Sequence, residues 1–423
     1  MGMPLCRARS LLAMLLLAVL AGFVPHAAQA ALSRPNAIDR RVDALTSSQL
    51  LHEPATALVD PDRQAAAERL ARWTLPGWLL SVVAQIALLA YFWRSGYAAR
   101  LRDFLHHRMR SMWAVRFIFG AALALLAKLA SAIPEFYLYR IDRIMGLSNE
   151  LARDWALSWC GDTLVSMFAV GMLIAVVLWL VARTHQWYIY TAVGIVIVSI
   201  AVAYAAPFAR TFTHDRIEPL RGPLSARLNP IETRAGSSLP IYVQTRSDRS
   251  QIEAAFVEGL GNSDCLVLSD TLLAGETARE IAFAVAYELG YVRDHDPLRR
   301  ALYDALLVIF GIALAVFVAD RVGFRRDDDE LSRMALVGAL LCAAYLVVSP
   351  IDNAVNSGMA LRADRYAVAL THDPAAGVRA IVRQTDQSLG QVCPNVVTRI
   401  FLMRVPSAGV RIAAINGVPN GCP

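Results

Sequence analysis

The sequence predicts an α-helical membrane bundle of about six spans, preceded by a secretory signal, with a small α+β domain split around the last two spans. The 423-residue chain is 56% hydrophobic and has a mean hydropathy of +0.43, which is too apolar for an ordinary soluble protein. Apolar stretches long enough to cross a bilayer as helices lie at residues 75–93, 113–133, 163–181, 187–206, 301–318 and 334–349. Polar, turn-rich segments flank the last two of these stretches.

The first thirty residues are typical of a secretory signal. Arg7 and Arg9 precede an apolar run over residues 11–24, and Ala28-Gln29-Ala30 fits the small-x-small pattern of a cleavage site. We expect cleavage after Ala30. An uncleaved N-terminal anchor is the alternative, because a larger membrane protein follows the run.

Arginines in two loops predict the orientation of the bundle. They lie at residues 94–112 and between the last two spans: Arg94, Arg100, Arg102, Arg108 and Arg110, then Arg321, Arg325, Arg326 and Arg333. Short loops rich in arginine stay in the cytoplasm. The N-terminal segment and both polar segments are therefore expected in the periplasm, although the acidic run at residues 327–330 weakens the second signal. The secretory signal and the Arg- and Ala-rich composition favour a bacterial inner membrane.

Two ionisable residues fall inside predicted spans, Lys128 in the second and Asp304 in the fifth. Charges in a bilayer are costly, so we expect these side chains to face the bundle interior or to reach the interface near a span end. In a transporter-like or purely structural membrane protein they would line a pathway. The net charge of +6 does not indicate nucleic-acid binding, because no basic stripe or binding motif accompanies it. The predicted partner is the lipid bilayer.

The six cysteines form no C-x-x-C motif and no metal-like cluster. Cys393 and Cys422 both lie in the C-terminal polar segment. In an oxidising compartment they could pair and add about 3 kcal/mol by the loop-entropy model. Unpaired thiols remain an equal alternative.

Tyr287-Glu288-Leu289-Gly290-Tyr291 has the spacing of the zinc-protease helix H-E-x-x-H, with tyrosine in place of both histidines. In that helix the histidines lie one turn apart and hold Zn²⁺, while the Glu deprotonates the metal-bound water. Residues 241–245 and 265–268 are predicted strands of a hairpin, and a helix is predicted from Glu276 onward. A phenol with a pKa of about 10 is a poor zinc ligand at neutral pH, so packing of core tyrosines is the competing interpretation.

Separate segments in a fixed order resemble the CAAX prenyl protease 1 family of membrane zinc metalloproteases, from about residue 75 to the end. The matching pieces are Gly146-Leu147-Ser148-Asn149 with Trp155, Pro207, Pro219-Leu220, residues 254–261 and 267–273, the helix with Glu288, residues 363–367, and Pro406 with Arg411-Ile412. The resemblance implies a zincin-like peptidase domain. Its first part would be residues 207–300 and its second part 355–423, after the signal (1–30), an extracytoplasmic segment (31–74) and a four-span membrane domain (75–206), with a two-span hairpin (301–354) between the parts.

The same resemblance implies that every zinc ligand has been replaced. The two histidine positions are Tyr287 and Tyr291, and the position of the third ligand, a Glu, is Ala360. Ala254 stands where the family has an Asn on its substrate-binding strand, and Arg404 where it has the His of a late S-H-P motif. Glu288, as a vestigial general base, and Asp364, beside the ligand positions, remain. We therefore predict no cofactor.

Three functions follow from these observations. The first is an inactive relative that binds peptides or membrane-protein segments, or regulates an active homologue, with the edge strand at Ala254, Ala255, Phe256 and Val257 as the binding feature. The second is an active zinc endopeptidase with rearranged ligands, drawn from Glu288, Asp364 and His295, because His295 is expected one turn beyond Tyr291 on the same helix face. The third is the transporter-like or structural protein described above. Whether the chain is an enzyme is left open.

Overall fold

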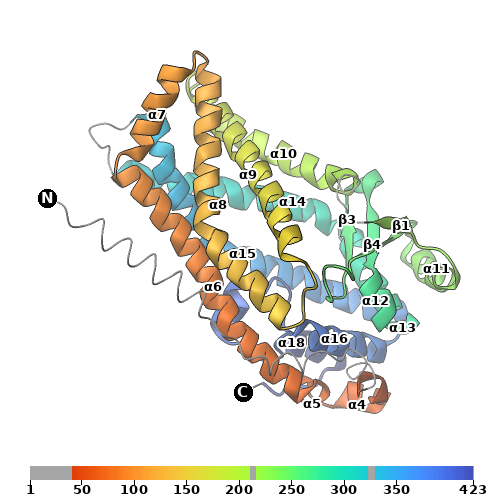
Figure 1. The fold of residues 1–423 in the computed structure, drawn as a ribbon. Helices are drawn as coiled ribbons and strands as arrows, with labels where there is room; N and C mark the ends of the chain where they lie inside the picture. Colours follow the sequence, from red (N-terminus) through yellow and green to blue (C-terminus); the bar gives the residue numbers. More distant parts are fainter. Residues whose placement is uncertain (1–40, 210–215, 323–328, 423) are drawn as a thin grey trace.

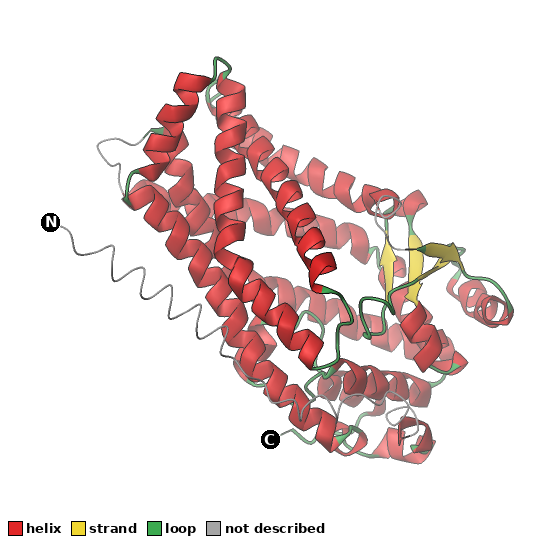
Figure 2. Ribbon diagram, in the orientation of Figure 1, coloured by secondary structure: helices red, strands yellow, loops and turns green. Residues whose placement is uncertain are grey.

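The computed structural model describes residues 41–209, 216–322 and 329–422, so the predicted signal peptide lies outside the described residues (Figure 1). Helices dominate, and the one small sheet drawn lies at the side of the molecule (Figure 2). Long helices form one end of the molecule, and short helices lie with the sheet at the other end.

Six helices of the described chain are long and apolar enough to cross a membrane, which confirms the six predicted spans. They are α6 (Pro61–Arg94), α8 (Met112–Ile144), α9 (Ala152–Val181), α10 (Trp187–Ala209), α14 (Asp296–Val322) and α15 (Glu330–Thr371). Several extend beyond the apolar stretch that predicted them. The helix α6 begins at Pro61 because the Asp60 side chain accepts hydrogen bonds from the backbone N–H groups of residues 62 and 63. The helix α15 continues past its span to Thr371 and carries Ala360 and Asp364.

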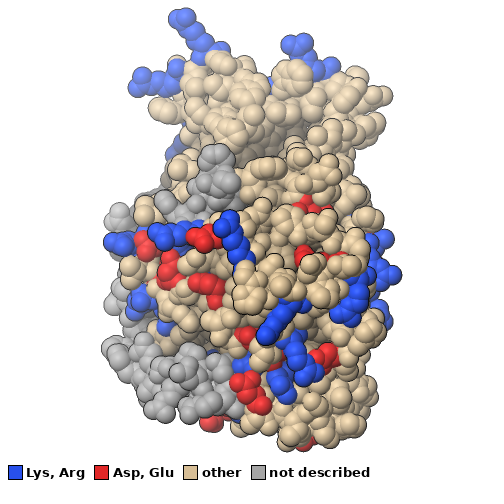
Figure 3. Space-filling view, turned by 90° about the vertical axis from the view of Figure 1, so that its right-hand side faces the viewer, with Lys and Arg blue, Asp and Glu red and all other residues tan. Residues whose placement is uncertain are grey.

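Small residues bring the membrane helices close together. A Cβ at Gly120 of α8 would lie 3.0 Å from the Cα of Gly171 on α9, so the two backbones are in contact. The helix α10 buries little of its surface inside the protein, as expected for a helix that faces lipid. Figure 3 shows a largely uncharged zone below the cationic side chains at the top of the molecule.

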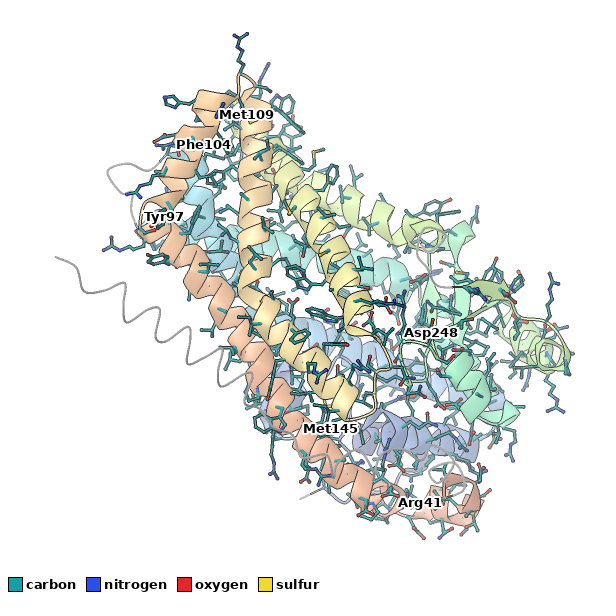
Figure 4. All side chains as sticks on the ribbon, in the orientation of Figure 1. Arg41, Tyr97, Phe104, Met109, Met145 and Asp248 are labelled. Carbon is teal, nitrogen blue, oxygen red and sulfur yellow. A yellow bond between two sulfur atoms is a disulfide. The ribbon has the colours of Figure 1, made fainter. Side chains whose placement is uncertain are left out.

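The two arginine-rich loops lie at the same end of the bundle. The short helix α7 (Tyr97–Arg108) occupies the first loop, and its Arg102 pairs at 3.0 Å with Asp329 of the second. Figure 4 shows Tyr97 and Phe104 at this end and Arg41 and Asp248 toward the other. The acidic run that weakens the second loop's positive signal therefore supplies one partner of the contact between the loops.

The two charges predicted inside spans both have partners. Lys128 lies 3.9 Å from Glu135 of its own helix, and Glu135 also accepts a hydrogen bond of 2.8 Å from the Trp159 indole of α9. Asp304 lies 3.5 Å from Arg300, one turn earlier on α14. Each is thus half of an ion pair.

The sheet holds four strands in the order β1-β2-β4-β3, with β1 (Ile217–Pro219), β2 (Ile241–Gln244), β3 (Ala255–Glu258) and β4 (Cys265–Ser269). The predicted hairpin between the second and fourth strands is wrong, since β2 and β4 run parallel. The antiparallel neighbours are β3 and β4, because the turn-prone segment before Cys265 connects these two. This order leaves β3 at an edge of the sheet.

Short helices complete the domain around α13 (Ala278–Arg293): α11 (Pro223–Ala235), α12 (Asp270–Gly275), α16 (Pro374–Ser388), α17 (Val396–Phe401) and α18 (Ala408–Asn416). The core below the sheet includes Leu266 and Leu268 of β4 with Phe283 and Val285 of α13. A Cβ at Gly377 of α16 would lie only 2.4 Å from the Phe283 ring, so this glycine lets α16 approach α13 closely.

The N-terminal segment folds back over the last helices. Its helices α4 (Ser47–His52) and α5 (Ala55–Leu58) share a buried apolar cluster with α16 and α18. The Arg41 guanidinium donates to the carbonyl of Val59 at 2.7 Å and pairs with Asp386 at 3.3 Å. A disulfide joins Cys393 to Cys422 beside this cluster, which is the pairing that the sequence left open.

Candidate functional site

The helix α13 is fixed at its start and along one face. Thr277 and Glu280 form a reciprocal capping box at its N-terminus, and Glu280 is fully buried. At the other end, a Cβ at Gly290 would lie 3.1 Å from the Cα of Ala363, so α13 and α15 touch at this point. The contact lets the two helices that carry the predicted site residues pack without a side chain between them.

The two tyrosines of the Y-E-L-G-Y segment bond to each other. The hydroxyl oxygens of Tyr287 and Tyr291 lie 2.8 Å apart, and their rings meet edge to face with centroids 5.2 Å apart. Burial raises the pKa of Tyr287 well above its usual range and that of Tyr291 to about 12. Both phenols are therefore neutral at physiological pH. Ala360, at the third ligand position, is fully buried on α15.

A buried ion pair lies against the first tyrosine. Arg411 of α18 donates two hydrogen bonds to the Asp364 carboxylate, at 2.9 and 2.7 Å, and Asp364 is fully buried. The same guanidinium lies 4.9 Å from the centroid of the Tyr287 ring, which is a cation–π contact. Both oxygens of Asp364 are thus engaged by an arginine.

Glu288 connects the helix to the edge strand. Its Oε2 accepts a hydrogen bond of 3.1 Å from the backbone N–H of Val257 on β3. Burial raises the pKa of Glu288 to about 8, so the carboxyl is mostly protonated at neutral pH. Because the Val257 N–H points to Glu288, it points away from β4, on the open side of the strand.

A cavity of about 740 Å³ contains this site. Val257 and Gly259 of the strand segment, Tyr287, Glu288 and Tyr291 of α13, and Arg411 of α18 form part of its wall. The cavity also reaches Ala203 and Ala206 near the end of α10, and it continues past α16 as far as Gln391. A volume of this size is enough to enclose a short peptide segment.

The side chains at the positions that the resemblance assigns to the zinc ligands do not suit a zinc ion. Two neutral phenols that bond to each other and a buried methyl group stand there, whereas a zinc site of this kind uses imidazole and carboxylate ligands. Over residues 41–209, 216–322 and 329–422, no three His, Cys, Asp or Glu side chains are grouped so that they could hold a metal.

One expectation about a neighbouring residue is wrong. His295 does not continue the face of Tyr291, because α13 ends at Arg293 and His295 sits exposed in the following turn with a φ of 53°. The ligand set of His295, Asp364 and Glu288 is therefore not assembled.

The edge strand starts one residue later than its predicted site. Ala255, Phe256 and Val257 lie in β3 and line the cavity, whereas Ala254 precedes the strand and its N–H donates to the Ser269 hydroxyl at 2.9 Å. The role of Arg411 was not predicted, although the residue belongs to a segment that resembles a family motif. Asp364 could have indicated it, because a buried carboxylate needs a cation or hydrogen-bond donors as partners.

A buried peptidase-type helix, an edge strand beside it and six membrane-crossing helices define this chain as a membrane protein of the metallopeptidase class. Residues 222–418 match Peptidase family M48. This match lies in the C-terminal part of the chain, and it agrees with the family that the motifs resemble.

Known relatives agree with this assignment. The chain is 24% identical over 338 residues to "Uncharacterized metalloprotease YhfN" of Bacillus subtilis, covering 75% of this chain and 77% of that protein. It is 27% identical over 233 residues to "Protease HtpX homolog 1" of Streptomyces coelicolor, covering 52% and 73%. The crystal structure of S. mikatae Ste24p has the same fold, with a TM-score of 0.72, 17% identity and coverage of 92% of this chain and 97% of that one.

Proposed function

We propose that this protein is a catalytically inactive membrane relative of the M48 peptidases that binds peptides or membrane-protein segments in its cavity. The observation that carries the proposal is the hydrogen bond of 2.8 Å between Tyr287 and Tyr291 where the family pattern places two zinc-binding imidazoles. Peptide hydrolysis by this class needs a metal to activate water and a carboxylate to take its proton. Neutral phenols, Ala360 and a protonated Glu288 supply neither.

The binding half of a peptidase does not depend on those ligands. An extended peptide can add to the edge of a sheet through backbone hydrogen bonds alone, and side-chain pockets then select the sequence. The strand β3 is such an edge, and it lines the cavity. Glu288 already accepts from one of its N–H groups, so a bound peptide would pair with the remaining open positions. A protein that holds peptides without cutting them would also regulate an active homologue by competing for substrates.

Metal content of the detergent-purified protein tests the proposal. We expect less than about 0.1 zinc per chain in the wild type, and near one in a Tyr287→His/Tyr291→His/Ala360→Glu variant that restores the three ligands. A Tyr287→His/Tyr291→His/Ala360→Leu variant is the matched control and should bind zinc weakly. Stoichiometric zinc in the wild type, with peptide cleavage that Glu288→Gln abolishes, would contradict the proposal.

We further propose that the protein lies in a bacterial inner membrane with its M48 domain in the periplasm. Two observations support this: the arginine-rich loops lie together at the end away from the domain, and the domain contains the Cys393–Cys422 disulfide, which persists in oxidising compartments. An alkaline phosphatase fused after Pro423 should be active. A green fluorescent protein fused there that fluoresces in place of phosphatase activity would reverse the orientation.

A further inference from the structure

The end of the cavity next to α16 contains oxygen acceptors that lack donors. Glu276 lies in the short connection between α12 and α13, and Gln391 follows α16; both line the cavity. The Glu276 Oε2 and Gln391 Oε1 atoms are buried, and no described residue donates a hydrogen bond to either. A buried acceptor without a donor costs free energy, so two in one cavity wall indicate that a ligand supplies the donors.

Acidic side chains gather at the same place. Burial and the neighbouring Glu253 carboxyl raise the pKa of Glu276 well above its usual range, so Glu276 keeps its proton unless a cation lies beside it. The buried Glu280 lies nearby. Arg383 lies 3.4 Å from Glu280 and 2.6 Å from Asp43. One guanidinium is thus shared among several acidic side chains.

A glycine makes room for one of these carboxyl groups. A Cβ at position 275 would lie 2.1 Å from the Glu253 Oε1 atom, so Gly275 leaves the space that the carboxylate occupies. Glu253 is 3% exposed. Two carboxyl groups held together away from water cannot both ionise without a large cost, and a bound cation would allow the second one to release its proton.

Arginines also line the cavity, but acidic groups lie beside them. Arg300 and Arg404 lie 3.9 and 3.5 Å from Asp352, and Arg300 also lies 3.5 Å from Asp304. These two cations are therefore already paired, whereas the Glu276 and Gln391 oxygens lack donors among the described residues.

We propose that the α16 end of the cavity, at Glu276 and Gln391, is a subsite for a lysine or arginine side chain of the bound peptide. The inference rests on the proposed peptide-binding function and adds its specificity. An alkylammonium has three N–H donors and a guanidinium five, with no acceptor, so either can donate to these oxygens and stabilise the ionised form of Glu276. The apolar cavity wall receives the rest of the peptide.

Fluorescence polarisation with designed peptides tests the subsite on the full-length protein in detergent. The probes are fluorophore-labelled hexapeptides of alanine and leucine, acetylated and amidated at their ends, with lysine or the isosteric norleucine at one position. We expect the lysine peptide to bind at least about tenfold more tightly, because it forms charge-assisted hydrogen bonds. A norleucine peptide with a free N-terminus separates a chain-terminal ammonium from a side-chain ammonium, and a gain for that peptide alone would overturn the side-chain assignment.

Two variants locate the effect. Glu276→Gln should abolish the preference for lysine, measured as the ratio of the two peptide affinities, and Gln391→Leu should reduce that ratio about threefold. Glu218→Gln, on an exposed residue of β1 outside the cavity, should keep the full preference. If Glu276→Gln fails to fold, Gln391→Leu still decides the question.

The outcomes separate the two proposals. Equal affinity of the wild type for lysine and norleucine peptides would overturn the subsite and leave peptide binding standing. Binding of neither peptide would overturn the proposed function, and the subsite would fall with it. A lysine preference that survives both variants would place the cation elsewhere in the protein and refute the assignment to Glu276.

Discussion

Tyr287 and Tyr291 hydrogen-bond each other across one turn of α13, with 2.8 Å between their hydroxyl oxygens. Side chains four residues apart on a helix are neighbours, which is why this spacing serves a pair of metal ligands and serves a pair of phenols equally well. One hydroxyl donates to the other at the cavity wall, so the pair contributes one buried hydrogen bond there.

Removing one hydroxyl should therefore cost more than its own bond. Tyr291→Phe leaves the buried Tyr287 hydroxyl without its partner, and we expect a loss of about 1 to 2 kcal/mol in the free energy of unfolding. The double variant Tyr287→Phe/Tyr291→Phe leaves no orphaned hydroxyl and should cost no more than the single one. Thermal unfolding in detergent measures both. A double variant that costs the sum of the two singles would show that the hydroxyls do not interact.

Arg411 should be necessary for folding of the domain. Arg411→Ala leaves the fully buried Asp364 carboxylate unpaired, and breaking a buried pair in this way typically costs about 3 to 5 kcal/mol. The double variant Arg411→Met/Asp364→Leu removes both charges and should recover most of the loss. Unfolding temperature and the yield of monodisperse protein report the difference. Arg411→Ala with wild-type stability would contradict the buried pairing.

Glu288 should make stability fall as pH rises. Its pKa is raised by burial from 4.5 to about 8 in the folded protein, so between pH 4.5 and 8 the unfolded state ionises first and gains free energy relative to the folded state. The stability that the neutral carboxyl provides is fully present below pH 4.5 and is lost through pH 8, in total about 3 to 5 kcal/mol. Glu288→Gln still accepts from the Val257 N–H but does not ionise.

Unfolding temperature against pH for the wild type and Glu288→Gln checks this. The variant should gain stability relative to the wild type as pH rises from 5 to 9. The exposed Glu218→Gln is the control and should follow the wild type. Parallel curves for the wild type and Glu288→Gln would mean that Glu288 titrates normally.

The disulfide should hold the C-terminal tail to the domain. Cys393→Ser/Cys422→Ser opens a loop of sequence separation 29, which the loop-entropy model values at about 3 to 4 kcal/mol. The tail bonds to the N-terminal arm through the Thr56 N–H and the Asn420 carbonyl, at 3.4 Å, so the arm should become protease-sensitive together with the tail. Limited proteolysis with and without reductant measures the protease sensitivity of the arm and the tail. Cys160→Ser, an exposed free thiol, is the control.

The membrane helices could be predicted from the sequence because burial in lipid requires long apolar runs, and each run sits in one observed helix. The ends of α6 and α15 could not be predicted in this way, because caps and contacts outside the bilayer extend these helices beyond their apolar runs. The parallel pairing of β2 and β4 was also missed. Two short apolar strands do not encode their partners, and the crossover through β3 is decided by packing.

The sequence by itself determined the class of the protein and indicated which residues to examine as a site, because motif spacing and residue type are local properties. Tertiary structure alone decided what those residues do. The Arg411–Asp364 pair and the contact of Glu288 with Val257 join residues that are 47 and 31 positions apart in the chain. Whether a polar side chain is paired, neutral or free for a ligand depends on which distant groups share its buried surroundings, and only the folded chain brings those groups together.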